Sequence, residues 1–179
     1  MKRTIYGGAL VLALAFATAG CKREQKVVHV QATEEETGPR LAANVSMADP
    51  KLEPQLLSGF YGIEGNAWRW TAKKFSVTLR TPSGGAQNGG VLDLELSVPD
   101  VVIQKLKSVT LSANAGDSAL PPETYTKSGQ YSYKRDVPPA ALTRGSLRVD
   151  FSLDKIVPPT GGDLRELGVI VSAVSLESK

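Results

Sequence analysis

Two alternating tryptophans are the residues whose type and spacing best suit binding chemistry. Trp68 and Trp70 stand in the segment WRWT, and a spacing of two residues places both indoles on one face of an extended strand, with Arg69 on the other. An indole can stack on the apolar face of a pyranose ring, while nearby Arg, Asp or Asn side chains bind the hydroxyl groups. The same spacing suits a structural role in the core. The binding hypothesis would be wrong if both indoles lay buried beneath the opposite sheet.

A second aromatic group surrounds a Ser-Gly turn. Tyr125 precedes this turn, and Tyr131 and Tyr133 alternate after it, so a hairpin would place the last two rings on one face. Tyrosines in such positions commonly stabilise neighbouring strands. If exposed, their amphipathic rings beside Lys127, Lys134 and Arg135 would form a contact surface for a glycan or a protein.

The sequence offers little for catalysis. The chain has one histidine, His29, and one cysteine, Cys21, and both precede the region of alternating segments described below. That region therefore lacks the base of a Ser-His-Asp or Cys-His arrangement and the usual ligands of zinc. A pair of glycosidase-type carboxylates is compatible with the composition, but Asp93 and Glu95 occupy outward strand positions and other aspartates stand in turns. We therefore expect no enzyme activity, no metal and no cofactor.

Short alternating segments dominate the chain from about residue 53 onwards. VLDLELSV, for example, places one face of a strand at Leu92, Leu94, Leu96 and Val98 and leaves Asp93, Glu95 and Ser97 on the other. Such alternation predicts half-buried antiparallel strands, and stretches such as TPSGGAQNGG supply the turns. Apart from one turn at PPAALTRG, no helical period persists. In LGVIVSAVSLE the apolar phase changes after Ala173, which predicts a bulge or burial on both faces. We expect a single all-β domain over residues 53–179, an antiparallel β-sandwich of jelly-roll type.

The N-terminus has the three-part layout of a secretory signal. Lys2 and Arg3 precede an apolar stretch that ends in Ala19 and Gly20, directly before Cys21. This stretch is shorter than the roughly 20 residues needed to span a bilayer. The arrangement resembles the lipobox of bacterial lipoproteins. That resemblance implies removal of the signal peptide and attachment of acyl chains, such as palmitate, to the cysteine. The alternatives are an uncleaved anchor helix and an ordinary secretory signal that leaves a free thiol.

A polar segment joins this lipobox to the alternating region. Residues 21–52 carry many charges and few large apolar side chains, without a sustained period, and this composition predicts a flexible tether. Such a tether spans on the order of 30 Å. Removal of Lys2 and Arg3 with residues 1–20 lowers the formal charge from +3 to +1. Because no basic block with interleaved aromatic residues remains, we expect no nucleic-acid partner.

The lipobox resemblance also implies a location in the cell envelope. Lys22 follows the cysteine where the inner-membrane retention signal carries Asp, which favours the outer membrane in a cell with two membranes. A lipid-anchored domain would then lie in the periplasm or at the cell surface. Stable anchoring requires more than one acyl chain, because each buried methylene contributes only about 0.8 kcal/mol.

Two sequence blocks resemble a known domain family. GFYGIEGNAWRWT and DLRELGV are similar to an early and a late motif of the galactose-binding-like β-sandwich domains found beside bacterial glycosyltransferases and in envelope proteins. The residues that match these motifs are Glu64, Trp68, Trp70 and Thr71 in the first block and Asp163, Arg165, Leu167 and Gly168 in the second. The resemblance implies a fold more than a ligand.

A structural reading of these motifs is also available. The guanidinium of Arg165 could reach a carboxylate such as Glu64 and join the terminal strands through a charge-assisted pair. In that reading both motifs close the sheet instead of forming a binding site.

The sequence as a whole predicts a membrane-anchored lipoprotein whose β-sandwich binds an envelope component without catalysis. The fold resemblance favours carbohydrate as that component. The alternative is a structural or assembly subunit that docks another envelope protein. A sugar-binding domain should carry a concave patch lined by aromatic residues, whereas a docking subunit should carry a flat apolar patch or an open strand edge.

Overall fold

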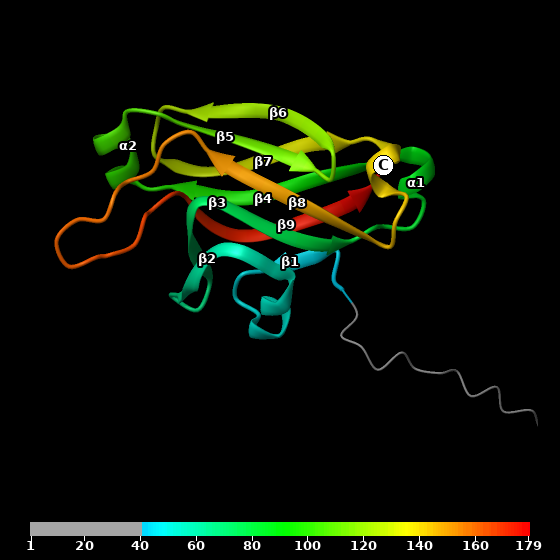
Figure 1. Cartoon of the computed structure of the whole chain (residues 1–179), viewed down its shortest axis with the longest axis horizontal. Helices are drawn as coiled ribbons and strands as arrows, with labels where there is room; N and C mark the ends of the chain where they lie inside the picture. The colour runs from blue at the N-terminus through cyan, green and yellow to red at the C-terminus, as the bar shows by residue number, and fades with distance from the viewer. Residues whose placement is uncertain (1–40) are drawn as a thin grey trace, which may run out of the picture. The chain divides into compact units, whose positions relative to one another are not determined.

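The computed structural model describes residues 41–179, so Cys21, the predicted signal peptide and most of the predicted tether lie outside the described residues. The described part contains nine strands and four short helical segments (Figure 1). In chain order these are β1 Asn44–Ser46, η1 Pro50–Gln55, β2 Leu56–Glu64, β3 Trp68–Arg80, α1 Gly85–Asn88, β4 Gly90–Val98, α2 Asp100–Leu106, β5 Val109–Ala115, β6 Ser118–Tyr125, β7 Gly129–Val137, η2 Pro139–Leu142, β8 Ser146–Leu153 and β9 Ile170–Ser178. Among residues 41–179, no helix has the length and apolar character required to cross a membrane.

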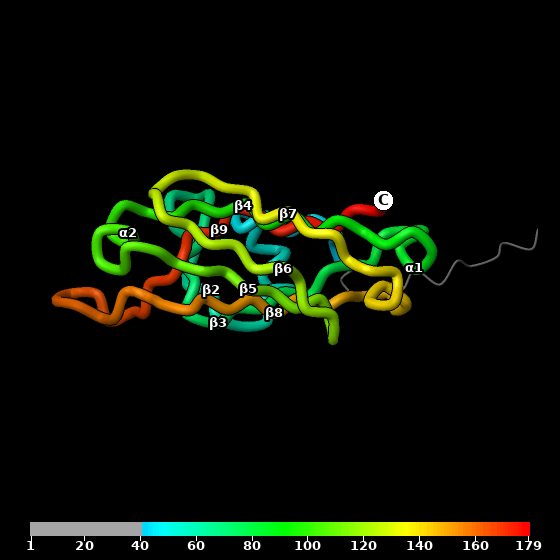
Figure 2. Tube along the Cα trace, turned by 90° about the horizontal axis from the view of Figure 1, so that it is seen from above, coloured from blue at the N-terminus to red at the C-terminus, as the bar shows by residue number. Residues whose placement is uncertain are grey.

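The strands form an antiparallel sandwich, which confirms the predicted fold class. Their hydrogen-bonded order is β6-β5-β8-β3-β9-β4-β7, with β1 added to β9 and β2 added to β3. The long strand β3 connects the layers, because residues 74–80 pair with β8 while Arg69 and Trp70 pair with β9. Seen from above, β4 and β9 run along one side, whereas β3 and β8 run along the other (Figure 2).

The core is made by the inward faces that the alternation predicted. Leu92, Leu94 and Leu96 of β4 are buried, and Glu95 between them is exposed. Across the sandwich, the rings of Phe75 on β3 and Phe151 on β8 stack with centroids 4.9 Å apart. Full burial of one such side chain contributes roughly 1.5–3 kcal/mol, so these inward faces hold the layers together.

A bulge in β9 resolves the phase change that the sequence contains. Glu95 of β4 pairs with Ala173, but the next residue, Leu96, pairs with Val171. Ser172 is therefore the extra residue on β9, and the shift allows both Val171 and Val174 to be buried. Of the two alternatives that the sequence left open, a bulge and burial on both faces, the structure contains the bulge.

The predicted start of the domain is wrong. β1, at Asn44–Ser46, pairs with β9, and both Val45 and Met47 are fully buried. Residues assigned to the tether therefore belong to the sheet and the core, and the boundary at residue 53 is too late. The structure also contains α2, Asp100–Leu106, which the sequence analysis missed; η2 at Pro139–Leu142 is the single helical turn that it expected.

Candidate functional site

The two sequence motifs meet in space. Arg165 donates a hydrogen bond from Nη1 to Oε1 of Glu64 at 2.6 Å, although the two residues lie 101 positions apart. Its Nη2 also donates to Oδ2 of Asp163 at 2.8 Å. The side-chain hydrogen bonds from Arg165 to Asp163, together with one from the Arg165 backbone amide, lower the pKa of Asp163 to about 2. The predicted Arg165–Glu64 pair is present and ties the loop before β9 to the end of β2.

Thr71 completes this closure between β3 and the segment before β9. Its buried hydroxyl donates to the carbonyl oxygen of Val169 and accepts from the Val169 amide, both at 3.1 Å. The Gly168 amide donates to the Thr71 carbonyl oxygen at 2.8 Å. Glu64, Thr71, Asp163 and Arg165 therefore act as structural residues in this arrangement.

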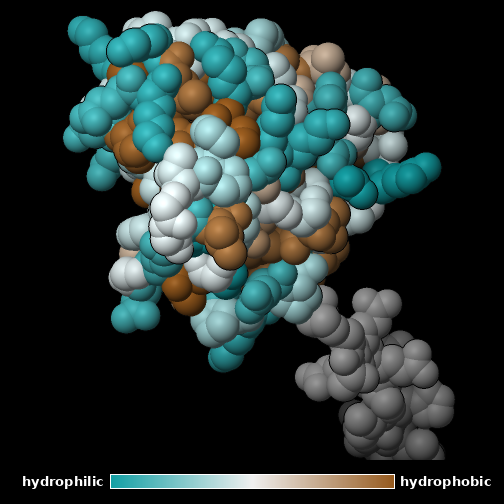
Figure 3. All heavy atoms as spheres, turned by 60° about the vertical axis from the view of Figure 1, so that its left-hand side comes forward, coloured by the Kyte–Doolittle hydropathy of each residue, from teal (hydrophilic) through white to brown (hydrophobic). Residues whose placement is uncertain are grey.

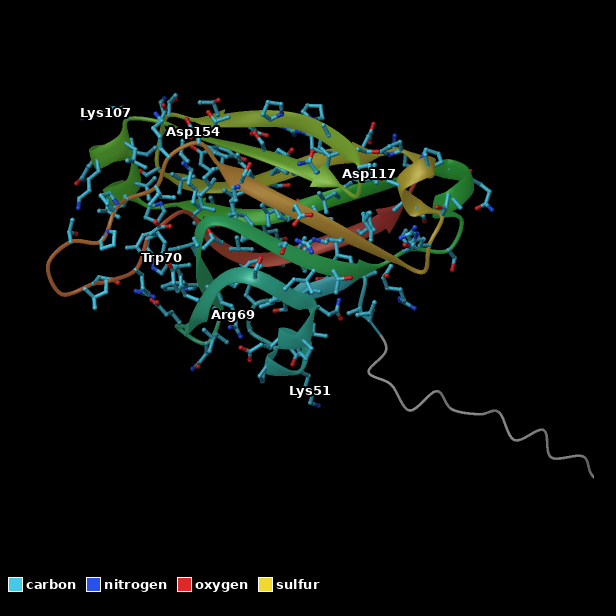
Figure 4. The ribbon with its side chains drawn as sticks, viewed as in Figure 1. Lys51, Arg69, Trp70, Lys107, Asp117 and Asp154 are labelled. Atoms are coloured by element: carbon cyan, nitrogen blue, oxygen red, sulfur yellow. The ribbon has the colours of Figure 1, made fainter. Side chains whose placement is uncertain are left out.

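The two tryptophans have different environments. Trp70 is 9% exposed and belongs to the core, which corresponds to the structural role that the sequence analysis left open for it. Arg69 is buried as well and donates to the carbonyl oxygen of Tyr61 at 3.1 Å; Figure 4 shows it on the side of β2. Trp68 is only half-buried and lines an open groove. Of the two indoles, Trp68 alone remains available to a ligand.

The groove lies over the outward faces of β4, β7 and β9, with Trp68 at one side, and has a volume of about 560 Å³. Its lining residues are Ala67, Trp68, Glu95, Leu96, Ser97, Gln130, Tyr131, Ser132, Ile170 and Ser172. The set combines an aromatic and aliphatic surface with hydroxyl, amide and carboxylate groups. The bulge in β9 brings Ser172 to the groove, where its Oγ lies 3.4 Å from the main-chain oxygen of Glu95.

A tight turn positions the indole of Trp68. Gly65 and Asn66 join β2 to β3 and both have positive φ, 57° and 53°, as in the primed turns of hairpins. The Ala67 amide closes the turn by donating to the Glu64 carbonyl oxygen at 3.1 Å. A Cβ at Gly65 would lie 3.0 Å from Trp68 Nε1, so the ring rests against this turn. Trp68 is therefore held in place before any ligand arrives.

The tyrosines do not form the predicted exposed hairpin surface. β6 and β7 stand at opposite ends of the strand order and are not bonded to each other in the sheet. Tyr125 and Tyr133 are buried, and the rings of Tyr125 and Tyr131 lie 4.6 Å apart. Tyr133 donates to the carbonyl oxygen of Pro121 at 2.8 Å, and Arg135 lies over its ring at 4.1 Å. These residues close the sandwich between β6 and β7, and burial raises the pKa of Tyr125 and of Tyr133.

Exposed apolar side chains occur on several elements. Leu57 and Ile63 lie on β2, Val101 lies on α2, and Leu164, which is 86% exposed, lies in the loop between β8 and β9. On the face drawn in Figure 3, apolar patches are interrupted by hydrophilic side chains. The groove beside Trp68 differs from these isolated apolar side chains, because both apolar and hydrogen-bonding groups line it.

Sequence reasoning named Trp68 and Tyr131 but missed the rest of the groove lining. Glu95 and Ser97 were recognised as outward strand positions without a role, and Gln130, Ser132, Ile170 and Ser172 were not singled out. The alternation of β4 and β7 was the available signal for Glu95, Ser97 and Ser132. Only the pairing of β4 with both β7 and β9 brings these positions together.

Comparison with known proteins reveals similarity only among solved structures. No family model matches this chain, and no curated protein matches it. A carbohydrate-binding module studied for specific mannan recognition is 13% identical over 78% of this chain and 97% of its own, with a TM-score of 0.44. The CBM36-1 domain of a multidomain xylanase from the hindgut metagenome of Trinervitermes trinervoides is 12% identical over 76% and 96%, with a TM-score of 0.41.

A glycoside hydrolase is also among the similar structures. This is a family GH115 4-O-methyl-alpha-glucuronidase with specificity for decorated arabinogalactans, 13% identical, with a TM-score of 0.46. The match covers 78% of this chain but 18% of the enzyme, so this chain corresponds to a small part of that protein.

Proposed function

We propose that the described domain is a non-catalytic binding domain whose groove holds a carbohydrate of the cell envelope. The observation that carries this proposal is the half-exposed indole of Trp68 beside a cluster of hydrogen-bonding side chains in one groove. A pyranose ring has an apolar face that packs on an aromatic ring and hydroxyl groups that require polar partners. The groove supplies both kinds of partner.

The dimensions and composition of the groove support a small number of sugar units. Its volume of about 560 Å³ lies within the roughly 300–1,000 Å³ of ordinary ligand sites. Ile170 and Trp68 provide apolar surface, while Ser97, Gln130 and Ser132 provide hydroxyl and amide groups. The side-chain amide of Gln130 makes no hydrogen bond to another residue within 41–179. It is therefore free to bind a hydroxyl group of a ligand.

The carboxylates near the groove favour binding over hydrolysis. Glycosidases ordinarily use two carboxyl groups that face each other across the scissile bond. In the described part of the chain, Glu95 is the one carboxylate that lines the groove. Its neighbour Asp93 accepts from Ser132 Oγ at 2.6 Å and pairs with Lys134 at 3.1 Å, so it is engaged in the sheet.

The location is part of the same proposal. We infer that Cys21 is lipidated after removal of residues 1–20 and that the chain before β1 connects the anchor to the domain. The domain would then bind its ligand close to a membrane surface, with the outer membrane favoured in a cell that has two. The lipobox-like sequence before Cys21 supports this inference.

Replacement of Cys21 by serine is expected to release the protein from membranes and to abolish incorporation of a labelled fatty acid. Serine has no thiol to receive the lipid, so the anchor cannot form. Fractionation of cells and metabolic labelling with an alkyne palmitate analogue measure the two effects. Retention of Cys21→Ser in the membrane fraction would instead indicate an uncleaved N-terminal anchor.

A screen of the purified full chain against glycans and envelope polysaccharides tests the proposed ligand class. We expect saturable binding that Gln130→Ala weakens about two- to ten-fold, because one ligand hydrogen bond contributes about 0.5–1.5 kcal/mol. Gln87→Ala is the matched control, since Gln87 is exposed on α1 and lies outside the groove lining. Calorimetry on the best ligand measures both variants.

Absence of binding to every glycan would contradict the proposed function. Equal affinity of wild type and Gln130→Ala for a bound glycan would place the site elsewhere on the domain. In the first case, specific cross-linking to one envelope protein would support the alternative function of an assembly subunit.

A further inference from the structure

Among residues 41–179, Glu95 is the one negatively charged side chain that lines the groove, and no basic residue of this part lines it. The residue is exposed on the outward face of β4, and its Oε2 lies 3.4 Å from Ser172 Oγ. Within residues 41–179 it forms no ion pair. The Glu95 carboxylate is therefore available to interact with a charged group of a ligand.

The surroundings of the groove do not neutralise this charge. Asp93, two residues earlier on the same face of β4, is matched by Lys134 at 3.1 Å. That lysine is thus occupied by another carboxylate. The remaining lining residues carry hydroxyl, amide or apolar side chains. Among the described residues that line the groove, Glu95 is therefore the one that carries a charge.

Trp68 favours the same sign of charge in a ligand. The face of an indole attracts cations through its ring quadrupole, and tryptophan does so most strongly among the aromatic residues. Trp68 and Glu95 line one groove, so a positively charged substituent on a bound sugar is favoured near either of them. A carboxylate on the sugar would be repelled by Glu95 and disfavoured by the ring.

We propose that the groove prefers saccharides that carry protonated amino groups, of the glucosamine type, and discriminates against uronic acids. This preference rests on the proposed carbohydrate-binding function and concerns the same site. Interaction with an exposed carboxylate is modest, so each engaged amino group should improve affinity about two- to five-fold. Salt should reduce the preference, because counterions screen charges at an exposed site.

Four hexasaccharides that share one β-1,4-linked glucose-type backbone allow the effect of ligand charge on affinity to be measured separately. They carry a hydroxyl, a protonated amine or an N-acetyl group at C2, or a carboxylate at C6. Binding is measured at about pH 6, where an ordinary carboxyl group is ionised, at low and at high salt. We expect the amino hexasaccharide to bind best and the acidic one worst, with the two neutral ones between them.

Glu95→Gln should abolish the charge preference, so that the ratio of affinities for the amino and neutral hexasaccharides falls to about one. Glu177→Gln is the matched control, because Glu177 is an exposed glutamate on β9 outside the groove lining and its loss changes the net charge equally. Equal binding of amino and neutral sugars by the wild type would overturn the inference. A uniform loss of affinity in Glu95→Gln would also overturn it, since that result indicates a hydrogen bond instead of charge selection.

The two proposals fail in distinguishable ways. Absence of binding to all four hexasaccharides overturns the amino-sugar preference. The broader glycan screen decides independently whether the groove binds carbohydrate. Equal wild-type affinity for amino and neutral sugars, weakened for both by Gln130→Ala, would retain the proposed function and remove only the charge preference.

Discussion

Replacement of Trp68 by alanine is expected to lower affinity for a bound glycan about 30-fold. Tryptophans that form the centre of a binding surface contribute about 2 kcal/mol or more, and 1.4 kcal/mol corresponds to about a factor of ten in the dissociation constant. Of the two tryptophans, only Trp68 has its indole in the groove, because Trp70 is in the core. Calorimetric titration of the glycan found in the screen measures the loss.

Two further variants separate binding from folding. Trp68 also packs against the core, so thermal unfolding of Trp68→Ala must accompany the titration. Trp68→Phe keeps an aromatic face and should retain part of the affinity, because stacking requires a ring but not the indole nitrogen. Full affinity in a folded Trp68→Ala variant would exclude this groove as the binding site.

Replacement of Gly59 by alanine is expected to reduce the free energy of unfolding by about 3 kcal/mol. Gly59 has φ +75° at a register shift between β2 and β3, where an L-residue costs roughly 1–2 kcal/mol. An added Cβ would also overlap the Lys74 carbonyl oxygen and lie 2.7 Å from Phe75 Cα, which are backbone atoms that cannot turn aside. Overpacking of this kind adds about 1–3 kcal/mol.

The neighbouring Gly62 provides a matched control on the same strand. A Cβ at Gly62 meets nothing within 4 Å, and its φ is not in the left-handed region. Gly62→Ala should therefore leave stability nearly unchanged, whereas Gly59→Ala should lower the melting temperature by roughly 10 °C. Urea unfolding of both variants measures the difference. Similar stabilities of the two would show that β2 does not cross β3 as closely as described.

The strands themselves could be predicted because alternation is a local property. Leu92, Leu94 and Leu96 face inward and Glu95 faces outward, as the spacing of β4 requires. The phase change in β9 was also visible, and it corresponds to the bulge at Ser172. Short elements were missed because a period becomes visible only over several residues. β1 has three residues, too few to display a period, and its place in the sheet depends on pairing with β9.

The tyrosine segment shows why a turn signal is insufficient to predict pairing. Lys127, Ser128 and Gly129 give the chain a turn between β6 and β7, and the sequence analysis interpreted it as a hairpin. In the structure the two strands belong to opposite ends of the strand order. Tyr133 and Arg135 bind the Pro121 carbonyl oxygen across the gap instead of through strand pairing. A turn specifies a change of direction, while the layer that receives the next strand depends on the rest of the fold.

Sequence alone determined the antiparallel β-sandwich and the inward and outward faces of its strands, and it named Glu64 as one carboxylate that Arg165 could reach. Tertiary structure alone decided that Trp70 is core while Trp68 lines a groove, and that Glu95, Gln130 and Ser172 join it there. The physical reason is the range of the interactions. Side-chain direction repeats every two residues and can be read from neighbouring positions. A groove requires β4 to lie between β7 and β9, and that order results from packing among strands far apart in the chain.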